Sequence, residues 1–177
     1  MSSQDKPSQF ARTAKTRRLA FSAMFAALAL IFSYIEALIP IPIPVPGVKL
    51  GIANLVIIIA LYRMGFRYAL SINCVRIVIA GLLFSGVFGM IYSFAGGFLS
   101  LCIMYALKRT GLFSMVGVSM AGGVMHNLGQ LIAACLIVST SSLMSYFAVL
   151  LFTGIIGGIL VGIPAYIIEQ RLPADIR

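Results

Sequence analysis

The chain has 177 residues, of which 61% are hydrophobic and only 10% charged, and its mean hydropathy is +1.08. This composition excludes an ordinary soluble domain and predicts an integral membrane protein. The net charge of +9 comes from basic residues in short segments between long apolar runs, which is typical of membrane topology and not of a nucleic-acid-binding surface. Cys74, Cys102 and Cys135 lie within apolar runs without metal-ligand spacing, so we interpret them as buried small hydrophobic residues.

Six apolar runs predict an all-α, polytopic membrane protein with six transmembrane helices, forming one membrane domain over residues 19–168. The predicted helices cover residues 19–39, about 51–62, 68–86, 87–107, about 112–138 and about 144–168. Residues 1–18 form a basic tail and residues 169–177 a polar tail. The second run is short for a span, so residues from about Val45 are expected to add depth to it. Only serine and glycine mark the boundary between the third and fourth runs, near Gly86.

Between the first two runs, residues 40–50 form a loop in which prolines alternate with apolar residues. Pro40, Pro42, Pro44 and Pro46 each lack an N–H group and restrict the residue before them, so this segment cannot continue a helix. It is expected to be extended and stiff. A stiff strip at a membrane surface suggests a lid or a wall for a binding site.

The distribution of basic residues predicts the orientation of the chain. With six spans and an internal N-terminus, eleven of the thirteen Lys and Arg residues fall on the cytoplasmic side. They are Lys6, Arg12, Lys15, Arg17, Arg18, Arg63, Arg67, Lys108, Arg109, Arg171 and Arg177. Lys49 falls outside and Arg76 within a span. Both termini are therefore predicted to be cytoplasmic, and the proline-rich loop extracytoplasmic.

Polar residues within the apolar runs are candidates for a binding site, because a charge at the centre of a bilayer costs about 2.5–3.5 kcal/mol on insertion scales. The candidates are Glu36, Lys49, Asn54, Asn73, Arg76, His126, Asn127 and Gln130. They would lie from the middle of the membrane to its outer surface, beneath the proline-rich loop. Arg76, Lys49 and His126 could receive an anionic or strongly polar ligand, with the amides fixing its orientation. Alternatively, Glu36 neutralises Arg76 or Lys49, and the amides hold helices together.

Small residues form a second pattern. Glycines recur every three to five residues in the last three predicted helices, which is typical of close helix packing in lipid. The first predicted helix is rich in alanine, and Ala23 and Ala27 have the spacing of a smooth helix face. Such a face could dock another membrane protein or pack within the chain.

The types of residue that the sequence lacks also restrict its function. Acidic residues occur only at Asp5, Glu36, Glu169 and Asp175, so no aspartate-rich motif could hold magnesium on a diphosphate. The sequence has neither a glycine-rich ATP-binding loop nor a zinc-protease motif. We therefore expect no enzyme activity, no metal site and no cofactor. ATP-driven work would have to be done by partner proteins.

The run from Glu36 to Asn54, with its alternating prolines and the segment Pro-Gly-Val-Lys-Leu-Gly, resembles the signature of the Gx transporter family. That family is often labelled heptaprenyl diphosphate synthase component I, and the resemblance extends over nearly the whole chain from Arg17 onward. The family resembles the substrate-binding S components of energy-coupling factor (ECF) transporters. Those are six-helix proteins that capture vitamins or other micronutrients and dock on a membrane coupling protein with two ATPases.

The resemblance implies an S-component-like helical bundle in the plasma membrane of a prokaryote. It implies that residues 40–50 lie over an outward-facing site and that Ala23 and Ala27 face the coupling protein. It implies no particular ligand. Two other functions stay open, which are a non-catalytic accessory subunit beside a separate prenyl diphosphate synthase, and a stand-alone carrier that uses Glu36 and His126.

Overall fold

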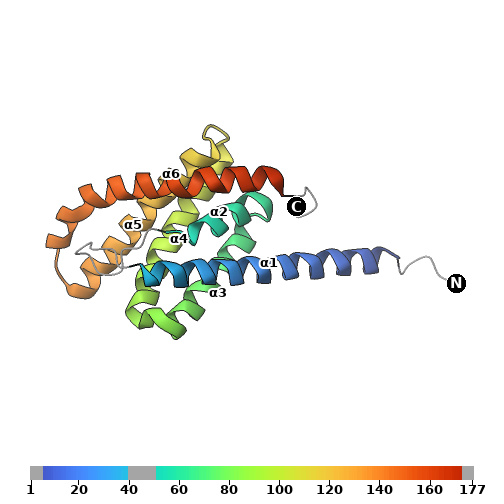
Figure 1. The fold of residues 1–177 in the computed structure, drawn as a ribbon, viewed down its shortest axis with the longest axis horizontal. Coiled ribbons are helices and arrows are strands. Elements are labelled where there is room, and N and C mark those ends of the chain that lie inside the picture. Colours follow the sequence, from blue (N-terminus) through green and yellow to red (C-terminus); the bar gives the residue numbers. More distant parts are fainter. Residues whose placement is uncertain (1–5, 40–50, 173–177) are drawn as a thin grey trace.

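The computed structural model describes residues 6–39 and 51–172. These residues form six α-helices and no strand, so the predicted all-α class is confirmed for this part of the chain (Figure 1). The helices are α1 (Lys6–Leu38), α2 (Asn54–Arg63), α3 (Phe66–Ala80), α4 (Gly86–Thr110), α5 (Met115–Val138) and α6 (Phe147–Arg171). A π-helical turn, η1 (Gly81–Ser85), precedes α4, and a 3₁₀ turn, η2 (Ser142–Tyr146), precedes α6.

Four segments of the described chain are long and apolar enough to cross a membrane. They are Thr16–Leu38, Phe66–Thr110, Met115–Val138 and Ser142–Arg171. The remaining apolar helix, α2, has 10 residues and is therefore about 15 Å long, roughly half the thickness of a bilayer's hydrocarbon core. The structure thus supports a membrane protein with four candidate spans in the described residues, and the predicted number of six spans stays a prediction. The residues from Val45 that were expected to deepen the second span lie outside the described residues.

The long segment Phe66–Thr110 folds back on itself as a hairpin. The rings of Phe66 and Tyr105, at its two ends, have centroids 4.8 Å apart, and further along the hairpin Gly81 lies against Met90. The chain reverses at Gly86, whose φ of 67° is in the left-handed region that glycine adopts at little cost. The predicted boundary near Gly86 therefore coincides with this turn.

Helix α1 begins at Lys6, whereas the sequence predicted a helix only from residue 19. Nothing in residues 8–18 breaks a helix, since this stretch lacks glycine and proline. Pro7 lies in the first turn, where a missing N–H costs nothing. Figure 1 shows the first part of α1 extending beyond the other helices, on the same side of the molecule as the end of α6.

Glycine allows α5 and α6 to approach with their main chains in contact. A Cβ atom at Gly158 would overlap the Cα of Met120, and one at Gly154 would lie 2.8 Å from the Cα of Val124. The α4–α5 contact is similar, because a Cβ at Gly129 would lie 2.7 Å from the carbonyl oxygen of Ala95. In these contacts the small residues act as the sequence pattern predicted.

The core surrounds α2, of whose ten residues seven are buried. Large apolar side chains are exposed on the outer helices instead, for example Leu82, Val87, Leu136, Phe152 and Leu160. A soluble protein rarely exposes apolar surface on this scale, whereas a protein in lipid does.

Candidate functional site

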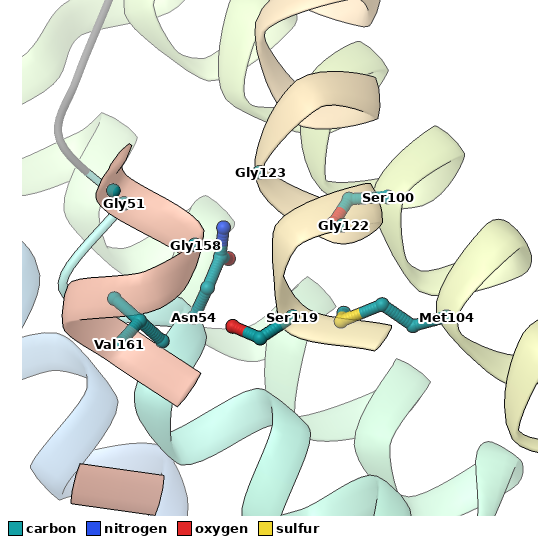
Figure 2. A pocket seen from close by; sticks show the side chains of 10 residues that line it. Gly51, Asn54, Ser100, Met104, Ser119, Gly122, Gly123, Gly158 and Val161 are labelled. Carbon is teal, nitrogen blue, oxygen red and sulfur yellow. The ribbon is translucent and has the colours of Figure 1, made fainter. Parts of the chain in front are cut away.

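A cavity lies where the start of α2 meets α4, α5 and α6 (Figure 2). Its lining residues are Gly51, Asn54, Ser100, Met104, Ser119, Gly122, Gly123, Gly157, Gly158 and Val161. The empty space measures about 250 Å³ including its open part. Its enclosed interior is narrow, with room for about one water molecule.

The polar groups of this cavity are hydroxyls and one amide. Ser100 is only 1% exposed, and its Oγ has no hydrogen-bond partner among the described residues. Ser119 is also buried, and Asn54 is partly exposed. Figure 2 shows the side chains of Asn54 and Ser119 extending into the space between α5 and α6. No charged residue belongs to the part of the lining that the structure describes.

Glu36, at the end of α1, holds the main chain that leads into α2. Its Oε1 accepts a hydrogen bond from the Gly51 amide. Gly51 has a φ of 80°, and its carbonyl oxygen accepts a hydrogen bond of 2.8 Å from the Asn54 amide at the start of α2. Glu36 thus connects the end of α1 to the rim of the cavity. The sequence offered no signal for this role, because Glu36 and Gly51 are 15 residues apart.

Arg76 belongs to a separate polar cluster between α1 and α3. It is 6% exposed and donates hydrogen bonds to Ser33 Oγ at 3.2 Å and to Asn73 Oδ1 at 2.6 Å. Glu36 also interacts with it electrostatically. The Nε of Arg76 has no hydrogen-bond partner within the described ranges. Ser33 is a member of this cluster that the sequence-based list missed, and its position three residues before the candidate Glu36 is the signal that could have identified it.

The three polar candidates on α5 have different surroundings. Asn127 donates to the Leu150 carbonyl oxygen at 2.8 Å and to Thr153 Oγ1 at 3.3 Å, so it links α5 to α6. His126 and Gln130 face α4 instead, where a Cβ at Gly96 would lie within 3.2 Å of both side chains. Gln130 is 0% exposed, and neither end of its amide has a hydrogen-bond partner among the described residues.

The predicted site residues are therefore not gathered in one pocket. Asn54 lines the cavity, whereas Glu36, Asn73 and Arg76 form the α1–α3 cluster. His126, Asn127 and Gln130 lie on α5 and do not belong to the cavity lining. Lys49 lies outside the described residues. Ala23 and Ala27 are exposed on the surface of α1.

Two basic residues that the sequence marked only for topology also bind helix ends. Lys108 Nζ donates to the Leu61 carbonyl oxygen at 2.7 Å, near the end of α2, and lies 4.8 Å from the centre of the Tyr62 ring. Arg63 forms an ion pair of 2.9 Å with Glu169 and donates to main-chain carbonyls at the end of α6. Cations at helix C-termini favour such bonds, and this is the signal that could have identified both roles.

The fold and the cavity define a polytopic α-helical membrane protein with a small, mainly apolar cavity between its helices, which carries two serines and one asparagine. Within this class, the chain belongs to the family described as heptaprenyl diphosphate synthase component I, whose sequence model matches residues 25–168. The family resemblance seen in Glu36–Asn54 is thereby confirmed. Comparison with curated proteins and with solved structures found no match.

Proposed function

We propose that this chain is the substrate-binding membrane component of an ECF-type micronutrient transporter. It binds a small polar ligand from outside in the cavity between α2, α4, α5 and α6, and ATP-hydrolysing partners drive its passage inward. The observation that carries this proposal is the position of the cavity. Its rim begins at Gly51, directly after the proline-rich loop, and the lining residues that the structure describes offer hydrogen-bonding groups without a set of catalytic side chains.

The proposal includes six membrane crossings with both termini in the cytoplasm. Two observations support it. The hairpin of α3 and α4 divides the longest apolar segment into two antiparallel helices. The contacts of Arg63 and Lys108 gather the ends of α2, α4 and α6 at one end of the bundle, which is the arrangement that the positive-inside rule requires of a cytoplasmic face.

Helix α1 offers a surface for a coupling protein. Ala23 and Ala27 lie one turn apart and are both exposed, so the helix backbone of a partner could approach closely. Met24 and Ile31, which are 53% exposed, flank them and could pack against that partner. These features favour docking over packing within the chain.

The docking proposal is tested by replacing Ala23 and Ala27 with leucine. We expect co-purification with the coupling protein and its ATPases to fall at least tenfold, because bulky side chains would hold the helices apart, while ligand binding to the isolated chain persists. Ala148→Leu, at an exposed alanine on α6, is the matched control and should leave assembly intact. Equal losses of assembly in the control, or of ligand binding in the double variant, would contradict the docking role.

The family description favours one other function, a non-catalytic membrane subunit beside a separate prenyl diphosphate synthase. The two functions differ in the partner that is bound. Affinity purification of the tagged chain from its native membrane should recover a coupling protein with ATPases under the first function, and a prenyl synthase subunit under the second. Substrate uptake without any ATPase would instead indicate a stand-alone carrier.

A further inference from the structure

We infer that Glu36 is a positioning residue of the cavity, which holds the main chain of Gly51 and thereby keeps Asn54 in the lining, instead of a group that contacts the ligand. The inference deepens the proposed function and rests on it, because a positioned cavity matters only if the cavity takes a ligand. It is drawn from the contacts that lead from the end of α1 to the start of α2.

The first contact joins Glu36 to the residue at which the cavity rim begins. Glu36 is 4% exposed, and its Oε1 accepts a hydrogen bond from the Gly51 amide. Gly51 is itself buried, so its N–H group has little access to water. A buried amide that loses its acceptor costs free energy. Loss of the Glu36 carboxylate should therefore make this part of the main chain move.

Gly51 in turn determines the position of Asn54. Its carbonyl oxygen accepts a hydrogen bond of 2.8 Å from the Asn54 amide, at the start of α2. A Cβ at Gly51 would lie 3.1 Å from Nδ2 of Asn54, so the asparagine side chain packs against this glycine. Figure 2 shows the same side chain extending into the space between α5 and α6. A shift of Gly51 would therefore move a polar group of the cavity lining.

The charge of Glu36 is used within the protein. Arg76, which is buried and bound to Ser33 and Asn73, interacts with it electrostatically. A carboxylate removed from water needs a cation and hydrogen-bond donors to offset its charge, and Arg76 and the Gly51 amide supply them. Glu36 does not belong to the described lining of the cavity. These contacts suit support of the rim better than contact with a ligand.

The test measures how fast a thiol in the cavity reacts in the ligand-free, full-length protein in lipid nanodiscs. Ser119→Cys places this reporter at a buried position of the lining. Methyl methanethiosulfonate, a small uncharged reagent, labels the thiol, and mass spectrometry resolves the rate at each cysteine. The native cysteines stay in place as internal references, because none of them belongs to the described lining.

Three variants separate the hydrogen bond of Glu36 from its charge. Glu36→Ala removes both and should raise the labelling rate of the reporter at least about fivefold, because a released rim admits the reagent to a narrow interior. Glu36→Asp keeps the charge but is one methylene shorter, so it should lose Gly51 and raise the rate similarly. Glu36→Gln keeps the length and an acceptor oxygen, so the rate should stay within about twofold of the parent. Its melting temperature should still fall, because the charge opposite Arg76 is lost.

Ser93→Cys is the matched control reporter. Ser93 is also buried but lies outside the described lining of the cavity. We expect its labelling rate to stay the same in all three variants of Glu36. A parallel rise at both reporters would mean that Glu36 stabilises the bundle as a whole, and the positioning role would then be wrong.

The assay also separates this role from ligand contact and from the proposed function. If Glu36 only contacted the ligand, none of the three variants would change labelling of the ligand-free protein, and this result would overturn the inference. Fast labelling in Glu36→Gln with slow labelling in Glu36→Asp would assign the effect to charge and contradict it as well. Because the assay contains neither ligand nor partner, co-purification with a coupling protein decides the proposed function separately.

Discussion

Asn127 and Gln130 are amides on the same helix, three residues apart, yet the structure predicts opposite effects on stability when each is replaced. Asn127 has two hydrogen-bond partners on α6, whereas neither end of the Gln130 amide has a partner among the described residues. Asn127→Leu and Gln130→Met are the appropriate changes, since both keep the size and approximate shape of the side chain.

The magnitudes follow from the hydrogen bonds. Side-chain hydrogen bonds between membrane helices contribute about 0.6 kcal/mol each on average, so loss of the two from Asn127 should cost about 1 kcal/mol. A buried amide without partners costs about 1–3 kcal/mol, and Gln130→Met should recover that amount in the ligand-free protein. For a chain of this size, each kcal/mol shifts the melting temperature by about 2–4 °C.

A thiol-reactive fluorescent dye can follow unfolding of the detergent-solubilised protein. The chain has no tryptophan, but Cys74, Cys102 and Cys135 are free and only partly exposed, so unfolding increases their reactivity. We expect the melting temperature to fall for Asn127→Leu and to rise for Gln130→Met. A fall of similar size in both variants would show that Gln130 is partnered in the folded protein, and would refute the reasoning.

Two further predictions concern packing and helix ends. Gly158→Ala should destabilise the protein by about 2–3 kcal/mol, because the added Cβ would overlap the main chain of Met120. Gly117→Ala is the control and should be neutral or stabilising, because the nearest neighbour of its Cβ would lie at 3.5 Å. Equal melting temperatures of the two variants would contradict the close α5–α6 contact. Arg63→Met should lower the free energy of unfolding by about 2–4 kcal/mol, because it removes both the ion pair and the hydrogen bonds to the end of α6. Glu169→Gln should lower it clearly less, because Arg63 keeps its main-chain acceptors. A larger fall in melting temperature for Glu169→Gln than for Arg63→Met in the same thermal assay would refute this.

The helices were largely predictable because each depends on a continuous apolar run and on local breakers. Gly65, Gly86 and Gly111 all have a positive φ and lie at helix boundaries, and such positions can be recognised from the sequence. The start of α1 was not recognised, because a polar helix that extends beyond the bundle lacks the apolar pattern that identifies a span. Helix α2 is also shorter than the run that predicted it, since the chain bends at Gly51 before the helix begins.

The candidate site was only partly predictable because its contacts join distant parts of the chain. Arg76 and Ser33 are 43 residues apart, and only the folded chain brings them into contact. The cavity itself is bordered by glycines, whose spacing predicted close packing but not the space left beside it. Ser100 and Ser119 were passed over because single serines are common in membrane helices. Their positions one turn from Gly96 and Gly122 are the signal that could have distinguished them.

Polar residues in this bundle differ mainly in whether they have hydrogen-bond partners, and less in their chemical type. Sequence reasoning grouped Arg76, Asn127 and Gln130 because each is costly in a bilayer. Arg76 and Asn127 bind groups on neighbouring helices, so their cost is offset by contacts that hold the bundle together. Gln130, like Ser100 on the facing helix α4, lacks a hydrogen-bond partner within the described chain. Stability alone does not explain such residues. Ser100 lines the cavity, where a ligand could supply the missing partner, whereas Gln130 does not belong to that lining.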